Sequence, residues 1–283
     1  MATVLEYHRP RLYPKQREAI FSSERISVIE ASTKSGKTSG CLVWLFEQAL
    51  AGKPGWVFWW VAPVFAQAKM AFRRLKGSLP RWLYRANETE LTLTITPPGS
   101  VIFFKSADNP DSLYGEDVHA AVIDEASRCK EEAWHAVRTT LTATQGPIRV
   151  IGNVRGKKNW AYFLARRAES GDPGMVYSKL TAYDAVEAGV VSLEEVEEAR
   201  RQLPEPVFKE LYLAEPTDDG GNPFGWTRFV SVSGRCLPIP LKSGGSTLRS
   251  LSTGRSVSLS MLKVGSVDLR DGSRPGERLA IGF

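Results

Sequence analysis

The sequence is poor in the residues that hold small secreted domains and metal knuckles together. Its 283 residues include only three histidines and three cysteines, and Cys41, Cys129 and Cys236 are too scattered for a disulfide framework or a zinc knuckle. No apolar run approaches the roughly 18 residues of a transmembrane helix, and the N-terminus MATVLEYHRPRLYPKQ has no apolar signal-peptide core. We therefore expect no membrane association and a reducing, cytoplasmic setting.

Acidic residues are also in the minority. Lys and Arg number 37 against 31 Asp and Glu, so the net charge is +6. An excess of positive charge suits a polyanionic partner, although it says nothing about the fold. Segment 68–85 is dense in Lys and Arg and includes Trp82 and Tyr84, so it is either a surface for DNA phosphates or an ordinary solvated helix.

What the sequence does contain is an alternation of buried-strand and helical patterns. We predict strands at 26–31, 56–63, 119–127 and 147–156, a strand pair within 90–107, and helices at 38–52, 64–79 and 130–143. Such alternation is typical of an α/β fold with a mostly parallel sheet between two layers of helices.

The pattern changes after residue 156. We predict that residues 1–156 form the core and that residues 157–216 form a small appendage of helices and one strand. From about residue 225 the sequence is rich in Ser, Gly and Arg, and its isolated apolar residues bury too little surface to offset the entropy of ordering. Residues 217–283 are interpreted as a linker and a disordered tail, a truncated or frame-shifted remnant of a second domain.

The first predicted strand leads into a candidate phosphate-binding loop. Residues 30–40 read EASTKSGKTSG, which ends like such a loop but has Ala31 where the first glycine belongs. Backbone N–H groups between a strand and a helix can point at phosphate. We expect Lys37 to reach the terminal phosphates and the Thr38 hydroxyl to ligate Mg²⁺. A plain polar turn is the alternative. The predicted nucleotide-binding residues of the loop are Ala31, Ser32, Thr33, Lys34, Ser35, Gly36, Lys37 and Thr38.

Two further strand ends carry polar side chains suited to phosphate chemistry. VIDEAS delivers Asp124, which would hold the magnesium ion, and Glu125, which would orient and deprotonate the attacking water. In VIGNVRG, Asn153 would lie beside the γ-phosphate and sense hydrolysis. The alternatives are an acidic helix start for the first segment and an ordinary turn for the second.

A Tyr and a Gln precede the first strand. In LYPKQREAI, the amide of Gln16 has the paired donor and acceptor that can read adenine. The ring of Tyr13 can stack on the base. The alternative is an N-terminal helix without a binding role.

Over about residues 8–224 the chain resembles the ATPase part of phage terminase large subunits. The resemblance rests on an ordered series of segments, YPKQ, ASTKSGKT, WWVAPVFAQAK, NPDSLYGEDVHAAVIDEAS, IGNVRG and YLAEPTDDGGNPFG. It implies a P-loop NTPase fold of the RecA-like (ASCE) type, with ATP and Mg²⁺ as ligands. It also implies ATP-driven packaging of double-stranded DNA into procapsids, with a portal protein and a terminase small subunit as partners, by a ring of copies on the portal.

Carried over residue by residue, the resemblance implies specific roles. Gln16 would read adenine, Lys37 would bind the γ-phosphate, and Thr38 and Asp124 would hold Mg²⁺. Glu125 would be the catalytic carboxylate and Asn153 would couple hydrolysis to movement.

The chain departs from the family pattern in its arginines. Several relatives have an arginine just before the glycine matched by Gly115, where it acts on a neighbouring subunit's ATP, but this chain has Tyr114. Loss of such an arginine costs ~10³ or more in rate. Lys34 stands where many members have a basic residue, often Arg, and a lysine lacks the bidentate guanidinium. The alternative trans-acting candidates are Arg128, Arg138 and Arg155.

The tail is a second departure. Family members continue into an RNase H-like nuclease whose acidic residues hold two metals. The Ser/Gly-rich tail is too short for that domain, and we interpret Asp268 and Asp271 as part of a solvated turn. We therefore predict no nuclease activity from this chain.

Two other classes of protein share part of these features. A superfamily 2 helicase or translocase has a similar acidic box and upstream Gln motif, but it needs a second ATPase lobe, and we expect none after residue 216. An inactive prophage remnant would bind nucleotide or DNA without turnover. The intact Lys37, Thr38, Asp124 and Glu125 argue against a remnant, whereas the tail argues for one.

Overall fold

The fold is built on an eight-stranded sheet in the order β4-β5-β6-β3-β7-β8-β2-β9. A computed structural model describes residues 5–218 and 278–281 of the chain. From β6 to β9 in this order all neighbours are parallel, whereas β4 and β5 add antiparallel pairs at one edge. The strands are β2 (Ile26–Ala31), β3 (Val57–Ala62), β4 (Tyr84–Asn87), β5 (Thr92–Ile95), β6 (Val101–Ser106), β7 (Val118–Ile123), β8 (Ile148–Gly152) and β9 (Met175–Leu180).

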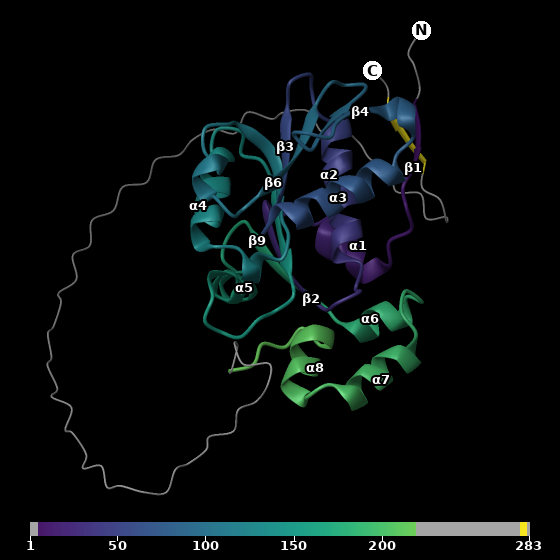
Figure 1. The fold of residues 1–283 in the computed structure, drawn as a ribbon, viewed down its shortest axis with the longest axis vertical. Helices are drawn as coiled ribbons and strands as arrows, with labels where there is room; N and C mark the ends of the chain where they lie inside the picture. The colour runs from purple at the N-terminus through teal and green to yellow at the C-terminus, as the bar shows by residue number, and fades with distance from the viewer. Residues whose placement is uncertain (1–4, 219–277, 282–283) are drawn as a thin grey trace, which may run out of the picture. The chain divides into compact units, whose positions relative to one another are not determined.

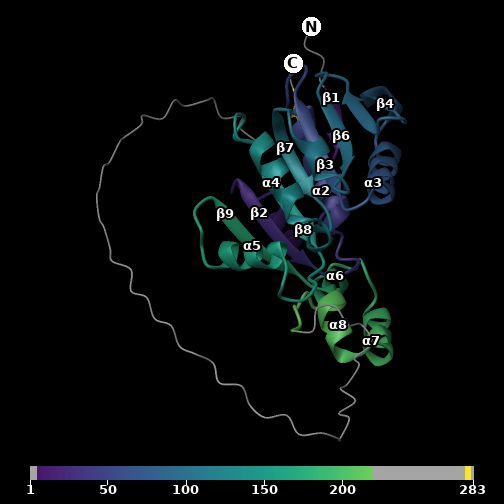
Figure 2. The ribbon, with the colours of Figure 1, turned by 60° about the vertical axis from the view of Figure 1, so that its left-hand side comes forward.

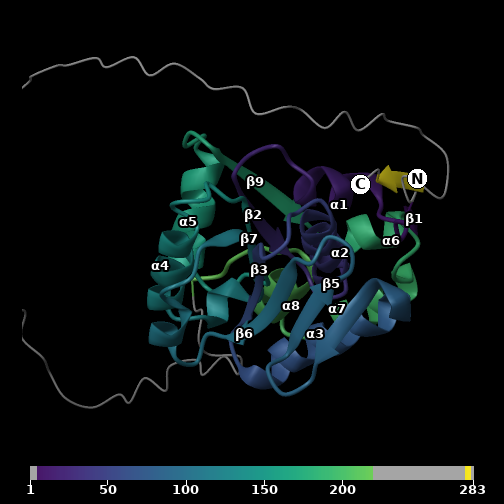
Figure 3. The same ribbon diagram turned by 90° about the horizontal axis from the view of Figure 1, so that it is seen from above.

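Helices cover both faces of the sheet, so the predicted α/β/α architecture is confirmed (Figure 3). One face carries α1 (Pro14–Ile20), α2 (Lys37–Leu50) and α3 (Phe65–Ser78), and the other carries α4 (Glu131–Thr140) and α5 (Trp160–Glu169). Three short 3₁₀ turns, η1 (Arg81–Leu83), η2 (Pro110–Leu113) and η3 (Ala126–Arg128), connect these elements. No helix within the described ranges is long and apolar enough to cross a membrane.

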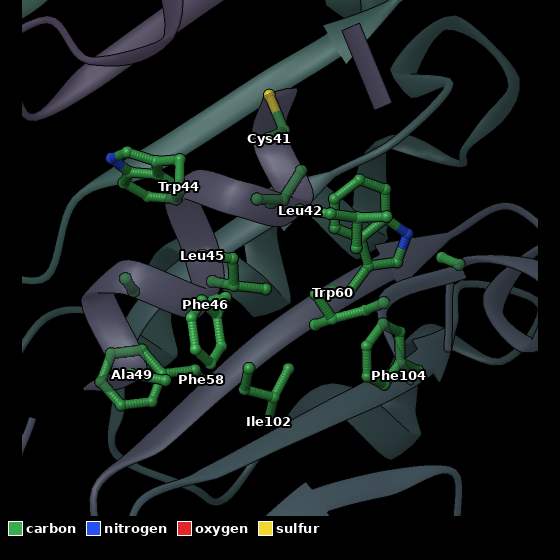
Figure 4. Close-up of a cluster of buried hydrophobic side chains, with 14 of the residues drawn as sticks. Cys41, Leu42, Trp44, Leu45, Phe46, Ala49, Phe58, Trp60, Ile102 and Phe104 are labelled. Carbon is green, nitrogen blue, oxygen red and sulfur yellow. The ribbon is translucent and has the colours of Figure 1, made fainter. Parts of the chain in front are cut away.

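The aromatic strand β3 shows why both faces are buried. Phe58 and Trp60 pack against α2 in one hydrophobic cluster (Figure 4). Trp59 and Val61 belong to a second cluster, shared with residues of α4 and α5. Successive side chains of a strand point to opposite faces, so one continuous apolar run supplies both cores, as is typical of parallel sheets.

The sheet extends beyond residue 156, where the sequence had suggested that the core ends. β9 pairs in parallel with β2 from Ile26–Met175 to Ala31–Leu180, and α5 packs on the α4 side of the sheet. β9 is the one strand predicted for the appendage, but its pairing with β2 was not predicted, because the partner of an edge strand is set by the tertiary structure. Residues 157–180 are therefore part of the sheet domain.

The remaining helices form a small cluster of their own. α6 (Ala182–Glu187), α7 (Leu193–Gln202) and α8 (Glu205–Tyr212) bury Ala182, Val196 and Phe208 between them. Figures 1 and 2 show these three helices beyond one end of the sheet, next to the end of β2. This helical cluster corresponds to the C-terminal part of the predicted appendage.

A second, two-stranded sheet joins the ends of the described chain. β1 (Leu5–His8) pairs antiparallel with β10 (Arg278–Ile281). This strand at residues 278–281 was not anticipated for the tail. The predicted linker and tail at 219–277, with Cys236, Asp268 and Asp271, lie outside the described residues.

A buried arginine fastens α1 to the sheet. Arg149 in β8 is 2% exposed, and its guanidinium donates to the carbonyls of Ile20 at 2.6 Å, Ser22 at 2.7 Å and Glu24 at 3.3 Å. It also lies 4.4 Å from the ring centroid of Trp44. Burial lowers the pKa of Arg149 to about 10, so the side chain stays charged at neutral pH. Carbonyls at the end of a helix lack partners within it, and Arg149 supplies the donors.

Replacing this arginine tests the contact. We expect Arg149→Met to lower the free energy of unfolding by about 3 kcal/mol, because several buried carbonyls lose their donors. Chemical denaturation measures the change. Arg201→Met, at an exposed position in α7, is the matched control and should change stability by less than about 0.5 kcal/mol. Equal losses in the two variants would contradict a special role for Arg149.

Candidate nucleotide-binding site

The candidate phosphate loop connects β2 to α2. Ala31 is buried as the last residue of β2 and is not among the residues with positive φ, so this position needs no glycine. Gly36, the residue before α2, has φ 79°, a left-handed conformation that favours glycine. Ser35 closes the loop by donating from Oγ to the Ser32 carbonyl at 2.9 Å. The sequence thus folds locally into the strand, loop and helix that the motif requires.

Tyr13 and Gln16 brace this loop from the side of α1. The Tyr13 hydroxyl donates to the Ser35 carbonyl at 2.8 Å, and Gln16 Nε2 donates to the Gly36 carbonyl at 2.8 Å. Gln16 Oε1 accepts from the backbone N–H of Tyr13 at 3.3 Å. Both side chains are buried, so the Gln16 amide is engaged within the chain. Reading of adenine by Gln16 and stacking by Tyr13 remain predictions.

Lys37 brings three strand ends together. Its ammonium, in the first turn of α2, donates to Asn153 Oδ1 at 2.6 Å and to the Ser32 carbonyl at 3.3 Å. It lies 3.5 Å from Glu125 Oε1. The side chain is 8% exposed, and a buried ammonium needs such polar partners. Lys37, Glu125 and Asn153, the three predicted catalytic residues, therefore share one site.

Asp124 follows β7 directly and is buried beside this site. Its carboxylate accepts the backbone N–H of Glu125 at 3.0 Å. Burial, with the neighbouring charge of Glu125, raises the pKa of Asp124 to about 7, while Lys37 opposes the shift. A carboxylate held in this way is costly to the folded protein and suits a role in binding a cation.

Glu125 has an unusual backbone. Its φ of 48° and ψ of 48° place it in the left-handed region, where residues other than glycine are uncommon. Such strain of order 1 kcal/mol persists where the surroundings enforce it, often at functional sites. The side chain is 22% exposed, which leaves it open to solvent beside Lys37.

Asn153 follows β8 and faces both neighbouring loops. Its backbone carbonyl accepts the Ser127 hydroxyl at 2.8 Å, and its Nδ2 is buried without a hydrogen-bond partner. A Cβ on Gly152 would lie 3.0 Å from the Ala126 nitrogen and 3.1 Å from Glu125 Cα. Glycine therefore lets β8 end close against the Asp124–Glu125 turn.

The residues fit a magnesium-nucleotide complex. Within the part of the chain that the structure describes, no group of three or more His, Cys, Asp or Glu side chains forms a metal cage. Mg²⁺ is commonly held by one or two protein oxygens together with substrate phosphates. Asp124 and Thr38, in the first turn of α2, are of that kind. The unpartnered Nδ2 of Asn153 is a donor free for a phosphate oxygen.

Contacts from α8 reach both loops of the site and were not predicted from the sequence. The backbone N–H of Thr33 donates to the Leu211 carbonyl at 2.7 Å. Glu210 Oε1 accepts the N–H of Gly156 at 2.8 Å and the hydroxyl of Thr217 at 2.7 Å. Sequence motifs identify side chains and not backbone hydrogen bonds, so Glu210 and Thr217 are the members of these contacts that a motif could have included. The helical cluster is thereby tied to the phosphate loop and to the loop after β8.

A buried carboxylate just before the loop was also missed. Glu30 in β2 accepts the Tyr177 hydroxyl at 2.7 Å and is paired with Arg166. Burial raises the pKa of Glu30, against the hydrogen bond from Tyr177. Tyr177 lies in β9 and Arg166 in α5, so this cluster fixes the edge of the sheet behind the loop.

The candidate arginines separate into two groups. Arg128 in η3 and Arg155 in the loop after β8 are exposed at the edge of the sheet that carries the phosphate loop. Arg138 is in the last turn of α4. The carbonyl of Leu141, just after α4, accepts a hydrogen bond from Arg25, which precedes β2. Arg138 therefore lies toward the edge of the sheet where β2 begins, opposite the phosphate loop. Tyr114 is 50% exposed after η2.

Comparisons with known proteins identify relatives. The family model described as "Terminase large subunit, T4likevirus-type, N-terminal" matches residues 28–230. The large terminase subunit of Thermus virus P23-45 is 29% identical over 151 residues, which are 46% of this chain and 30% of that protein. The chain thus matches less than a third of that relative's length.

Two solved structures share the fold. The large terminase ATPase domain of Thermus phage P74-26 superposes with a TM-score of 0.63 at 23% identity, over 73% of this chain and 94% of that one. The large terminase of bacteriophage D6E in complex with ADP gives a TM-score of 0.61 at 16% identity, over 72% of this chain and 53% of that one.

The buried position of Asp124 predicts a gain in stability when its charge is removed. Because its pKa is raised from the ordinary 3.8 to about 7 in the folded state, the stability it contributes is fully present only below about pH 4 and is lost as pH rises to about 7. Without magnesium, we expect Asp124→Asn to be more stable than the wild type at about pH 8, by roughly 1–3 kcal/mol, and to show little difference near pH 4. Thermal melts at the two pH values measure this, and a loss of stability at the higher pH would contradict it.

Proposed function

The chain belongs to the family of T4-like-virus-type terminase large subunits, whose N-terminal region it matches, and from this we propose that it hydrolyses ATP to drive double-stranded viral DNA into procapsids. The observation that carries the proposal is the convergence of Asn153 and Glu125 on the ammonium of Lys37. A loop that binds phosphate, a carboxylate beside it and a polar side chain at the next strand end are the parts of a phosphoryl-transfer site.

We assign each residue a role that its place in the fold supports. Lys37 would bind the γ-phosphate in exchange for its present contacts. Asp124 and Thr38 would hold Mg²⁺, which would neutralise developing charge on the phosphates. Glu125, partly exposed beside Lys37, orients the attacking water and accepts its proton. Asn153, bonded to Lys37 in the structure, changes partners when the γ-phosphate is present and passes that change to its loop.

Nucleotide binding has support from the fold. The ADP complex of the D6E large terminase has the same architecture, and the loop residues 31–38 lie between strand and helix in the same way as the motif requires. The hydrogen bonds of Tyr13 and Gln16 to the carbonyls of Ser35 and Gly36 hold the end of the loop in place before α2.

Translocation requires further partners. We infer double-stranded DNA, a portal protein, a terminase small subunit and further copies of this chain in a ring as those partners. Tyr114 replaces the expected trans-acting arginine, and Arg128 and Arg155 are the candidates exposed at the edge of the site. The family match favours a terminase over a superfamily 2 helicase. The close contacts among Lys37, Glu125 and Asn153 favour an active site over an inactive remnant.

A single substitution tests the hydrolytic site. We expect Glu125→Gln to lower steady-state ATP hydrolysis at least about 100-fold while nucleotide binding is kept, because only the proton acceptor is lost. Turnover with Mg²⁺ is measured with and without duplex DNA, and ATP binding is measured in parallel. Glu132→Gln, at an exposed position in α4, is the matched control. Wild-type turnover in Glu125→Gln would sink the assignment, and no turnover in the wild type with ATP still bound would favour the remnant.

A further inference from the structure

A hollow on the surface lies beside the candidate nucleotide site but contains none of the phosphate-loop residues. It is an open pocket of about 160 Å³ lined by Ser127, Arg155, Lys157, Lys158, Asn159 and Asp218. Three of these side chains are basic and one is acidic. None of residues 31–38 contributes to it, so the pocket is distinct from the phosphate loop.

The basic side chains of the pocket are only weakly engaged by acidic partners. Lys157 Nζ pairs with Asp218 Oδ1 at 2.7 Å, and the two side chains are 41% and 86% exposed. An exposed ion pair of this kind is worth little to stability, so an incoming anion can replace Asp218 at small cost. Arg155 and Lys158 are exposed and make no ion pair among the described residues.

The backbone around the pocket adds to its preference for anions. Asn159 caps α5 by accepting the N–H of Tyr162 at 3.0 Å, which places the positive end of the helix dipole at the pocket wall. Ser127 contributes a hydroxyl and also donates to the Asn153 carbonyl. Glu210 lies behind the loop, where its carboxylate is already satisfied by Gly156 and Thr217.

We propose that this pocket binds a phosphate group, supplied either by the backbone of DNA or by free phosphate. Guanidinium and ammonium groups around a hollow recognise phosphate oxygens without regard to base sequence. The pocket is linked to the hydrolytic site through Ser127 and Asn153, so an occupied pocket acts on the loop that carries Asn153. The DNA form of the proposal rests on the proposed packaging function.

The surface of α3 and β4 provides a contrast for the test. Arg73 and Arg85 are exposed there, and Met70 and Trp82 beside them are 63% and 61% exposed. This is the basic segment that the sequence offered as a DNA surface. Substituting Arg73 and Arg85 removes two positive charges, as does substituting Lys157 and Lys158. The two double variants therefore have the same net charge.

The experiment measures binding by the full chain without nucleotide. A labelled short duplex is titrated by fluorescence anisotropy at several salt concentrations, and inorganic phosphate is titrated in parallel by thermal shift. We expect the double variant Lys157→Gln/Lys158→Gln to weaken duplex binding about tenfold and to reduce the salt slope by about two. Asp218→Asn should strengthen binding, because Lys157 is released from its partner. The control Arg73→Gln/Arg85→Gln should have the smaller effect.

The outcomes separate the two sources of phosphate. Opposite effects of the lysine and aspartate variants on duplex binding indicate the DNA backbone, and opposite effects on the phosphate-induced thermal shift alone indicate free phosphate. Three outcomes would refute phosphate binding by the pocket. The lysine and arginine pairs could weaken binding equally, the Lys157/Lys158 and Asp218 variants could change binding in the same direction, or neither probe could show a change. This binding experiment contains no ATP, so it is independent of the hydrolysis test. If the wild type bound duplex DNA through the pocket but did not hydrolyse ATP, the proposed function would be refuted and the pocket would stand.

Discussion

The burial of the Lys37 ammonium is the constraint on which the rest of the site depends. A charge that is almost removed from water must be surrounded by oxygen atoms, and here these come from Ser32, Asn153 and Glu125. The three residues follow β2, β8 and β7, which are consecutive in the sheet. Parallel pairing brings their carboxyl ends to one edge, so the strand order itself assembles the site.

The same edge carries costs that the rest of the fold offsets. Asp124 is buried as a carboxyl group with a raised pKa, and Glu125 has a left-handed backbone. Neither feature favours folding of the free protein. The two apolar cores on either face of β3 and the hydrogen bonds of Arg149 to α1 supply stability that offsets these costs.

The sequence was most informative where a local pattern determines structure. The β2–loop–α2 unit, the apolar run at β3 and the acidic end of β7 are each specified by adjacent residues, so their positions were predicted closely. Arg149, Glu30 and the pairing of β9 with β2 were not, because their partners are remote in the sequence. The amide of Gln16 illustrates another limit. Its donor and acceptor suit either a base or a backbone group, and its contact with the Gly36 carbonyl became evident only from the fold.

The bond from the Thr33 N–H to the Leu211 carbonyl makes one backbone amide a reporter on α8. A hydrogen-bonded amide exchanges its proton with water only when the bond opens. Separation of α8 from the phosphate loop would therefore expose Thr33 to exchange, while amides within β2 stayed protected by their ladder with β8 and β9. Movement of the helical cluster would thus be recorded at a single position in the candidate phosphate loop.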